Sequence, residues 1–240
     1  MKILVTGGTG SLGTSLKKIF PNVFFPSRSE MDITDARIVE EAVLAYSPDV
    51  LVHTAAFVDV HGCEEDKLRA WKTNVEGTQN IVNAVSKLNN GCYLVYLSTA
   101  CVFAGENERY YTEDDVPSPK NFYGLTKMCG EVAVRQYKNS CIIRTNFVPR
   151  QKWKYPKAFV DRFGTYLFSD QVAQGISEVL QKKEKGIIHI VGDRRISMYE
   201  LAKLAGSKDV GELTLEEYKG PPLTIDMSLS TRRWKQYKIL

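Results

Sequence analysis

The stretch MKILVTGGTGSLG, residues 1–13, decides the fold. Residues 2–6 form a short apolar run with β-branched side chains, which predicts a buried strand. Three glycines follow at once with the spacing G-x-x-G-x-x-G, at Gly7, Gly10 and Gly13. Residues 11–20 then repeat apolar side chains at helical intervals, so the strand and the glycines lead directly into a predicted helix.

A strand, a glycine turn and a helix in this order form a cradle for phosphate groups. In such a cradle one glycine permits a tight turn, one lets the backbone approach a pyrophosphate, and one lets the helix pack closely on the strand. The alternative is a tight turn that is merely rich in glycine. Because the pattern follows a predicted strand and opens a predicted helix, we expect a dinucleotide-binding site here.

Strands and helices alternate along most of the chain. Apolar runs predict five further strands, at residues 23–26, 49–54, 92–97, 140–144 and 186–191. Helices are predicted at residues 34–46, 64–88, 121–137, 169–182 and 197–205, the second of them interrupted near Asn74. The expected caps are Thr34, Ser169 or Asp170, and Ser197 in a capping box with Glu200. The alternation implies right-handed crossovers and one parallel sheet, and therefore a Rossmann-like, doubly wound α/β fold.

A small C-terminal substrate lobe is expected beside the sheet. Residues 147–164 are irregular, basic and aromatic, and they follow a strand end, where substrate loops often lie. The polar tail from residue 206 is expected at the edge of this lobe. We therefore predict a dinucleotide-binding domain, residues 1–146 plus 166–192, and a reduced substrate lobe, residues 147–165 and 193–240.

Composition is that of an ordinary globular protein. The 240 residues are 43% hydrophobic and 25% charged. The net charge of +4 is mild and dispersed, so its few basic clusters are expected to be solvated faces and not a nucleic-acid site, and the charge fits an anionic nucleotide equally well. The five cysteines include no C-x-x-C pair, so neither a disulfide framework nor a zinc site is predicted. We see no signal-peptide pattern and no apolar run of membrane length. We expect a cytoplasmic protein without nucleic-acid or membrane partners, and leave a homodimer open.

The end of the second predicted strand bears on the choice of cofactor. In a dinucleotide-binding fold this position meets the adenine ribose, where an acidic residue accepts from a free 2′-hydroxyl and an arginine accommodates a 2′-phosphate. Arg28, between Ser27 and Ser29, favours NADP. Glu30 and Asp32 keep NAD open, and the alternative for Arg28 is an exposed loop residue.

Small and hydroxyl side chains follow the third and fourth predicted strands. Ala55 and Ala56 would let a flat ligand lie close, although small residues also serve helix packing. Thr99 follows the fourth strand, so its hydroxyl is expected in the ligand crevice. Tyr123 and Lys127 are four residues apart on one predicted helix and therefore share a face, although such pairs are also common in ordinary amphipathic helices.

The glycine turn, Thr99 and the spacing Tyr123-x-x-x-Lys127 together resemble the extended short-chain dehydrogenase/reductase superfamily. Further motifs resemble the dTDP-4-dehydrorhamnose reductases: DITD at 32–35, D-x-x-x-CE at 59–64, N-x-x-G at 74–77, YG-x-x-K-x-x-GE at 123–131, IRT at 143–145, GD-x-RIS at 192–197 and YELA at 199–202. The resemblance covers most of the chain, and the later motifs are more specific to sugar-nucleotide reductases.

The resemblance implies a chemistry and a set of site residues. A nucleotide-linked 4-keto-6-deoxy sugar would receive hydride from NADPH and a proton from Tyr123. Lys127 would lower the pKa of that tyrosine and hold the nicotinamide ribose, and Thr99 would orient the substrate oxygen. The implied cofactor contacts are Gly7, Gly10, Ser11, Leu12, Gly13, Arg28, Asp32, Ile33, Ala55, Ala56, Asn74, Tyr123 and Lys127. For Asn74 the alternative is a hydrogen bond to backbone between two helical segments, and no metal is predicted.

The chain departs from this family in two places. An Asp and a Tyr usually follow the hydroxyl residue of the fourth strand in those reductases, whereas Ala100 and Cys101 stand here. This leaves the identity of the sugar open, and it excludes dehydration, which uses an acidic pair at this position. The chain is also shorter than typical relatives. Five residues of the remaining lobe either meet a nucleotide diphosphate or belong to a solvated loop: Arg150, Lys152, Trp153, Lys154 and Lys157.

Two alternatives to a reductase stay open. A nucleotide-sugar epimerase would keep NAD tightly bound and would show no net consumption of it. A non-catalytic, NADP-binding regulatory subunit, like that of methionine adenosyltransferase, would bind cofactor without turnover. Thr99, Tyr123 and Lys127 favour an enzyme.

Overall fold

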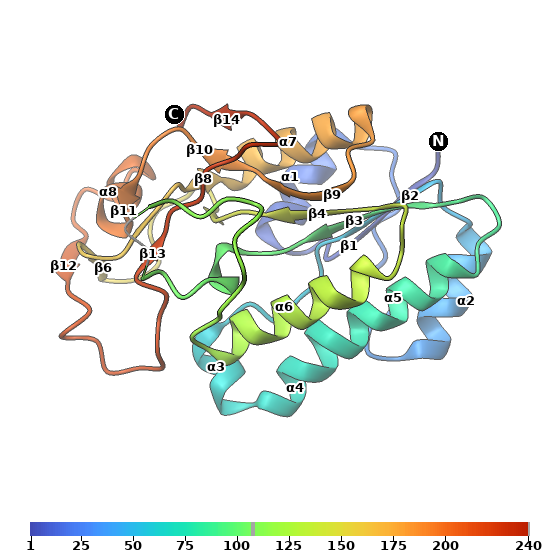
Figure 1. Ribbon diagram of the computed structural model, residues 1–240, viewed down its shortest axis with the longest axis horizontal. Coiled ribbons are helices and arrows are strands. Elements are labelled where there is room, and N and C mark those ends of the chain that lie inside the picture. The colour runs from blue at the N-terminus through green and yellow to red at the C-terminus, as the bar shows by residue number, and fades with distance from the viewer. Residues whose placement is uncertain (107–108, 240) are drawn as a thin grey trace.

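Five parallel strands form the centre of the protein. The computed structural model describes residues 1–106 and 109–239. The strands are β1 (Ile3–Thr6), β2 (Val50–His53), β3 (Tyr93–Leu97), β4 (Ser140–Arg144) and β9 (Gly186–His189), and they lie side by side in the order β1-β2-β3-β4-β9 (Figure 1). Every neighbouring pair is parallel, which confirms the predicted parallel sheet.

Helices cover both faces of this sheet. On one face α1 (Ser11–Ile19) packs beside α7 (Ser169–Lys182), and on the other lie α2 (Ala36–Tyr46), α5 (Gly77–Ser86) and α6 (Phe122–Arg135) (Figure 1). Side chains alternate along each strand, so Val5 packs under α1 and α7 while Leu4 packs under α2 and α5. The doubly wound Rossmann-like fold is therefore confirmed.

The predicted strand at residues 23–26 is shorter than expected. A single parallel bridge joins Phe24 to Leu4, through hydrogen bonds from Phe24 N to Ile3 O (3.1 Å) and from Val5 N to Phe24 O (2.9 Å). Pro26 has no N–H to continue the pairing. The bridge nevertheless puts this segment on the outer side of β1, so the winding reverses between β1 and β2. In such sheets, ligands bind at this reversal, beyond the carboxyl ends of the strands.

Two of the predicted helix caps are wrong. Asp35 caps α2 in place of Thr34, because its carboxylate accepts from the N–H groups of both Arg37 and Ile38 at 3.0 Å. Helix α7 begins at Ser169, so that the cap position belongs to Phe168 and neither Ser169 nor Asp170 occupies it. The capping box of Ser197 and Glu200 is confirmed at the start of α8 (Met198–Leu204).

The long helical stretch predicted over residues 64–88 consists of several pieces. These are α3 (Val60–Glu65), α4 (Lys67–Trp71), the π-helical turn η1 (Lys72–Glu76) and α5. The π-turn contains Asn74, so the predicted interruption near that residue is confirmed and has a structural form. A π-turn inside a helix redirects one residue's backbone and often accompanies a functional site.

Short strands and one helix gather beyond the carboxyl ends of the central strands, at left in Figure 1. They pair as β5 (Phe147–Val148) with β8 (Leu167–Phe168), β6 (Lys157–Phe159) with β12 (Gly211–Leu213), β10 (Val191–Gly192) with β14 (Gln236–Tyr237), and β7 (Phe163–Gly164) with both β11 (Ile196–Ser197) and β13 (Asp226–Met227). Residues 147–164 are therefore only partly irregular. The tail is no mere edge, since Met227, Leu229 and Ile239 pack with Phe103 in a buried cluster.

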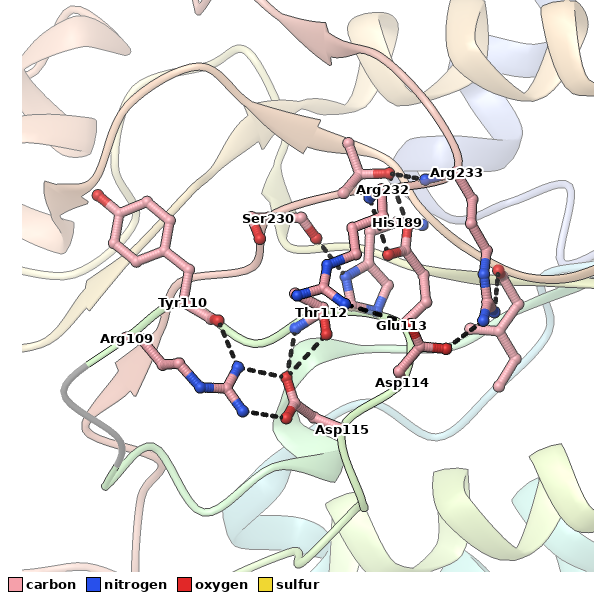
Figure 2. Close-up of polar contacts among 12 residues, drawn as sticks. Arg109, Tyr110, Thr112, Glu113, Asp114, Asp115, His189, Ser230, Arg232 and Arg233 are labelled. Carbon is pink, nitrogen blue, oxygen red and sulfur yellow. Dashed lines mark hydrogen bonds and ion pairs between the residues drawn. The ribbon is translucent and has the colours of Figure 1, made fainter.

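Glu113 fastens this C-terminal segment to the sheet. Its buried carboxylate accepts hydrogen bonds from His189 N (3.2 Å), Thr231 Oγ1 (2.6 Å) and Arg232 N (3.0 Å). Figure 2 shows how the loop that carries Glu113 meets residues 230–233, with Asp114 paired to Arg233 at the surface. The loop between β3 and α6 and the end of the chain thus hold one another in place.

All five cysteines are free thiols, and four of them are buried. Within residues 1–106 and 109–239, no helix combines the length and the apolar character that crossing a membrane requires. The division into a dinucleotide-binding domain and a substrate lobe stays a prediction.

Candidate active site

A cavity of about 850 Å³ lies beyond the carboxyl ends of β1 to β4. Its wall includes the glycine turn, the loops that follow β2 and β3, and the first turns of α6. All but one of the predicted site residues line it: Gly7, Gly10, Ser11, Leu12, Gly13, Arg28, Asp32, Ile33, Ala55, Ala56, Thr99, Tyr123 and Lys127. The fold thus brings residues 7 to 127 together in one cavity, and Asn74 is the exception.

The three glycines of the turn meet three different constraints. Gly7 has a φ of +77°, and a Cβ there would lie 2.7 Å from Ala55 N. At Gly13 a Cβ would lie 2.3 Å from the Gly7 carbonyl oxygen, so α1 packs directly on the turn. A Cβ at Gly10 would meet nothing nearer than 3.5 Å, because this glycine faces the cavity. The free N–H groups of α1 and the open backbone at Gly10 fit a pyrophosphate.

Arg28 and Asp32 form an ion pair at the other end of this wall. Arg28 Nε lies 3.0 Å from Asp32 Oδ2, while Asp32 Oδ1 accepts from the backbone N–H of Thr34 at 3.0 Å. Partial burial raises the pKa of Asp32, but the bonds from Thr34 and Arg28 outweigh it and hold this pKa below its usual value. The Arg28 side chain is 76% exposed, so its guanidinium can meet an anionic ligand without desolvation of the whole group.

Tyr123 is brought to Thr99 by the way in which α6 begins. Asn121 caps this helix by accepting from Gly124 N at 2.9 Å, and a Cβ at Gly124 would lie 2.2 Å from the Cys101 carbonyl oxygen. The helix start therefore packs tightly on the segment after β3. In this arrangement the Thr99 side chain lies close enough to the Tyr123 phenol to lower its pKa, while Thr99 Oγ1 accepts from Cys101 N at 3.1 Å.

Burial dominates the electrostatics of Tyr123 and Lys127. Burial raises the pKa of Tyr123 well above its usual value, and the nearby Thr99 side chain lowers it only in part. The net shift is upward, contrary to the expected lowering by Lys127. Burial also lowers the pKa of Lys127 to about 7, against the Glu131 carboxylate, which raises it. Lys127 Nζ lies 4.1 Å from the centre of the Tyr96 ring, which partly compensates its charge.

A buried ion pair joins α6 to the central sheet. Arg144 contacts Glu131 through Nε (2.9 Å) and Nη2 (2.7 Å), and both side chains are almost fully buried. Ser98 Oγ donates to the same carboxylate at 2.6 Å. The pair therefore ties the ends of β3 and β4 to the helix that carries Tyr123 and Lys127. Sequence reasoning gave these residues no role, although Glu131 and Arg144 lie in the motifs that carry the family resemblance.

Asn74 lies behind the cavity wall. Its side chain accepts from Phe57 N (2.7 Å) and donates to Phe57 O (2.9 Å) and to Thr126 Oγ1 (3.0 Å). Asn74 is buried and is not among the residues that line the cavity, which fits the alternative of a hydrogen bond to backbone. It holds the backbone of Phe57, which does line the cavity. Its part in cofactor binding stays a prediction.

Only part of the basic and aromatic segment after β5 lies at the cavity, where it could meet a nucleotide diphosphate. Lys152, Trp153 and Lys154 line the cavity. Arg150 pairs instead with Asp170 at 3.1 Å, and Lys157 lies in β6. Sequence reasoning missed several further lining residues: Phe57, Val58, Thr145, Asn146, Phe147, Tyr155 and Met198. Thr145 and Asn146 could have been found, because they follow β4 as Thr99 follows β3.

Three relatives show what the chain is similar to. It is 31% identical over 84% of its length to the spore coat polysaccharide biosynthesis protein SpsK of Bacillus subtilis (strain 168), of which it covers 77%. It is 27% identical to the dTDP-4-dehydrorhamnose reductase of Aggregatibacter actinomycetemcomitans over 90% of this chain and 81% of that protein. It is also 27% identical to methionine adenosyltransferase 2 subunit beta of Rattus norvegicus, over 84% of this chain and 70% of that one.

The fold has a close structural counterpart. The crystal structure of dTDP-4-dehydrorhamnose reductase from Bacillus anthracis, in complex with NADP, matches 99% of this chain and 95% of its own chain, with a TM-score of 0.91 at 22% identity. The family model described as "RmlD substrate binding domain" matches residues 1–211, most of the sequence. This confirms the resemblance drawn from the motifs: the chain belongs to the RmlD substrate binding domain family.

Proposed function

We propose that this protein is an NADPH-dependent oxidoreductase that reduces a nucleotide-linked 4-keto-6-deoxy sugar. One observation carries the proposal: Thr99, Tyr123 and Lys127 line the same cavity as the glycine turn. The names of the relatives support it, since several act as dTDP-4-dehydrorhamnose reductases. Reduction of the sugar needs a proton donor and a bound dinucleotide in one cavity. The wall of this cavity carries a side chain that can donate a proton and a glycine turn that can hold a dinucleotide.

The cavity wall suits NADP, with NAD as the alternative. The turn and the start of α1, from Gly7 to Gly13, would hold the pyrophosphate, and Ala55 and Ala56 would lie along the cofactor. Arg28 would meet a 2′-phosphate, with Asp32 and Ile33 beside the adenosine. Lys127 would hold the nicotinamide ribose. When bound, the nicotinamide supplies the hydride.

The chain's own residues supply the proton. Tyr123 donates its phenolic proton to the carbonyl oxygen of the sugar as that oxygen gains negative charge, so one O–H bond breaks while another forms. The Thr99 hydroxyl, which lies close to the phenol, orients the same oxygen. The Lys127 ammonium stabilises the tyrosinate that is left.

Substitution of Tyr123 tests this assignment. With dTDP- and UDP-linked 4-keto-6-deoxy sugars, the wild-type protein should consume NADPH, followed by the loss of its absorbance. Tyr123→Phe should lower kcat by roughly a hundredfold or more, the usual contribution of a positioned acid, and should leave the Kd for NADPH unchanged. Wild-type turnover in Tyr123→Phe would contradict the proposed role.

A regulatory subunit that binds cofactor without turnover is the second candidate. Ala100 and Cys101 stand where the reductases usually carry an Asp and a Tyr. Cys101 is buried, with its Sγ 3.5 Å from Met227 Sδ, and it does not line the cavity. One relative is a subunit of methionine adenosyltransferase. The same assay separates the candidates: a subunit would bind NADPH without consuming it and would co-purify with a partner, whereas an epimerase would retain NAD and convert its substrate without net oxidation.

The substrate would lie against residues 147–165 and 193–240. Lys152, Trp153 and Lys154 face the cavity and offer charge and a ring to a nucleoside diphosphate. The buried cluster around Phe103 and Met227 would hold residues 193–240 against the dinucleotide-binding part of the chain. A cytoplasmic location and a homodimer stay predictions.

A further inference from the structure

His53 is buried between two threonines beside the cavity. It is the last residue of β2, and it is 1% exposed. Its Nδ1 lies 2.7 Å from Thr6 Oγ1, and its Nε2 lies 3.2 Å from Thr78 Oγ1. Thr6 lines the cavity, and Thr78 lies in the first turn of α5. The ring therefore joins the end of the central sheet to the helix that follows the π-turn.

The direction of each hydrogen bond follows from the partners of Thr6. Its Oγ1 accepts from the backbone N–H groups of Thr54 and Ala55, both at 3.1 Å. A hydroxyl has two lone pairs and one proton, so these two bonds leave Thr6 with only its proton to share with His53. Nδ1 is then the acceptor. A neutral ring with an acceptor at Nδ1 carries its proton at Nε2, and there it donates to Thr78.

The other end of the chain of bonds agrees with this direction. Thr78 Oγ1 donates to the carbonyl oxygen of Asn74 at 2.7 Å, which leaves its lone pairs for His53 Nε2–H. Asn74 in turn holds Phe57 by its N–H and its carbonyl. Residues 54–57, which line the cavity, are thus held by Thr6 at one end and by Asn74 at the other.

We propose that His53 is a positioning residue, whose neutral Nε2–H form joins Thr6 to Asn74 and so fixes residues 54–57 against the glycine turn. The backbones of Gly7 and Ala55 are closely packed, since a Cβ at Gly7 would lie 2.7 Å from Ala55 N. A protonated ring would present a donor at Nδ1 to a hydroxyl whose lone pairs are already used. As far as it concerns cofactor binding, the inference rests on the proposed function.

The surroundings of the ring keep it neutral. Burial, together with the smaller effect of the Lys127 charge, lowers the pKa of His53 to about 3. The Tyr96 ring contacts both groups, with its centre 5.6 Å from the centre of the His53 ring and 4.1 Å from Lys127 Nζ. A second cation here would oppose the charge that we assign to Lys127.

The first test uses the wild-type protein without ligand. Long-range ¹H–¹⁵N NMR spectra of the imidazole rings, recorded from about pH 5 to about pH 8, report which nitrogen carries the proton. We expect His53 to show the Nε2–H form with no titration across this range. An Nδ1–H form, or a ring that becomes protonated, would overturn the proposal.

The second test uses substitutions at His53 that keep the hydrogen bond at the Nδ1 position, the one at the Nε2 position, or neither. Asparagine at His53 keeps an acceptor near the Nδ1 position, glutamine reaches the Nε2 position, and phenylalanine removes both. In His53→Gln and His53→Phe we expect the amides of Thr54 and Ala55 to exchange with solvent roughly tenfold faster, the loss of about one hydrogen bond. In His53→Asn they should stay slow.

Cofactor affinity completes this series. The Kd for NADPH should rise roughly tenfold in His53→Gln and His53→Phe, should rise less in His53→Asn, which keeps only the bond to Thr6, and should stay near wild type in the exposed control His61→Gln. Unchanged amide exchange in a folded His53→Gln would defeat the proposal. If wild type does not bind NADPH, the proposed function fails, while amide exchange still decides the role of His53. If His53→Phe does not fold, His53→Gln and the wild-type spectra decide.

Discussion

At the scale of single residues, Gly10 is open to the ligand site, whereas Gly13 is needed for the packing of α1. Substitutions at the two positions should therefore affect ligand binding and stability differently. Gly10 faces the cavity with a φ of −72°, which any residue adopts, and serine is a favoured cap at this position of α1. We expect Gly10→Ser to keep or raise the free energy of unfolding and to weaken NADPH binding by at least roughly tenfold, because its side chain enters the pyrophosphate site.

Gly13→Ser is the matched substitution. Its Cβ would lie 2.3 Å from the Gly7 carbonyl oxygen, so the helix must shift, and we expect a loss of roughly 1–3 kcal/mol in the free energy of unfolding. Urea unfolding and NADPH fluorescence titration measure the two quantities. Equal destabilisation by both substitutions would show that Gly10 is not open to the ligand.

Lys127 gives the stability of the protein a dependence on pH. Burial lowers its pKa to about 7, whereas a lysine in an unfolded chain has a pKa of about 10.4. Between these values the unfolded chain binds a proton that the folded protein does not, so the free energy of unfolding rises with pH. We expect wild type to gain stability relative to Lys127→Met between about pH 7 and about pH 10, followed by urea unfolding at each pH.

The control for this prediction is an exposed lysine of the same region, Lys138. Lys138→Met should run parallel to wild type over that pH range, since its side chain meets solvent in both states. A constant difference between wild type and Lys127→Met would show that the Lys127 amine is as well solvated in the folded protein as in the unfolded chain.

At the scale of elements, Glu113 joins the loop before α6 to the C-terminal segment (Figure 2). Burial raises the pKa of Glu113, but hydrogen bonds from Thr231 and Arg232 outweigh it and keep this pKa below its usual value. The stabilisation is therefore present above about pH 4.3, the value in an unfolded chain, and is lost as pH falls through the folded value. We expect Glu113→Gln to cost roughly 1–3 kcal/mol at neutral pH.

Chemical unfolding at two pH values checks this expectation. The difference between wild type and Glu113→Gln should shrink in acid, because the wild-type carboxylate is then protonated as well. Asp114→Asn is the control, since Asp114 is half exposed and its surface pairs with Arg232 and Arg233 contribute about 1 kcal/mol or less. A loss in Asp114→Asn equal to that in Glu113→Gln would remove the special role of Glu113.

The elements that could be predicted are those with a local signal. The central strands are apolar runs, and α8 has its serine and glutamate three residues apart. Phe24 lies in a similar apolar run but forms only a single bridge. A longer strand would need further backbone N–H groups to pair with β1, and Pro26 has none. Thr34 and Asp35 are both good caps, and only the structure shows which carboxylate or hydroxyl reaches the free N–H groups. Met227 and Leu229 are isolated apolar residues in a polar tail, and their burial depends on contacts far along the chain.

The candidate site divides in the same way. Thr99, Ala55 and the glycine turn follow from one rule, that the loops after parallel strands face the ligand. Thr145 and Asn146 obey it too and were overlooked. The hydrogen bonds of His53 follow no spacing rule in the sequence, since Thr6 is 47 positions away from His53 and Thr78 is 25 positions away.

At the scale of the whole molecule, cofactor binding should raise thermal stability. A ligand at a hundred times its Kd stabilises the folded state by about 2.7 kcal/mol, which for a chain of this size corresponds to a rise in Tm of roughly 5–10 °C. We expect NADPH to produce a larger rise than NADH at equal concentration, and Arg28→Ala to remove the difference. Differential scanning fluorimetry measures this, and an equal rise with both cofactors in wild type would argue against a 2′-phosphate contact at Arg28.

The bond between Glu113 and Thr231 joins residues 118 positions apart, and this has a consequence for how the chain is made. At a synthesis rate of about 5–20 residues per second, Glu113 emerges from the ribosome on the order of ten seconds before its partner. During that interval Phe103 and Tyr111 have no Leu229 to cover them. We therefore expect the nascent chain to present this apolar surface to chaperones until Leu229 and Thr231 have been made, after the strands of the central sheet.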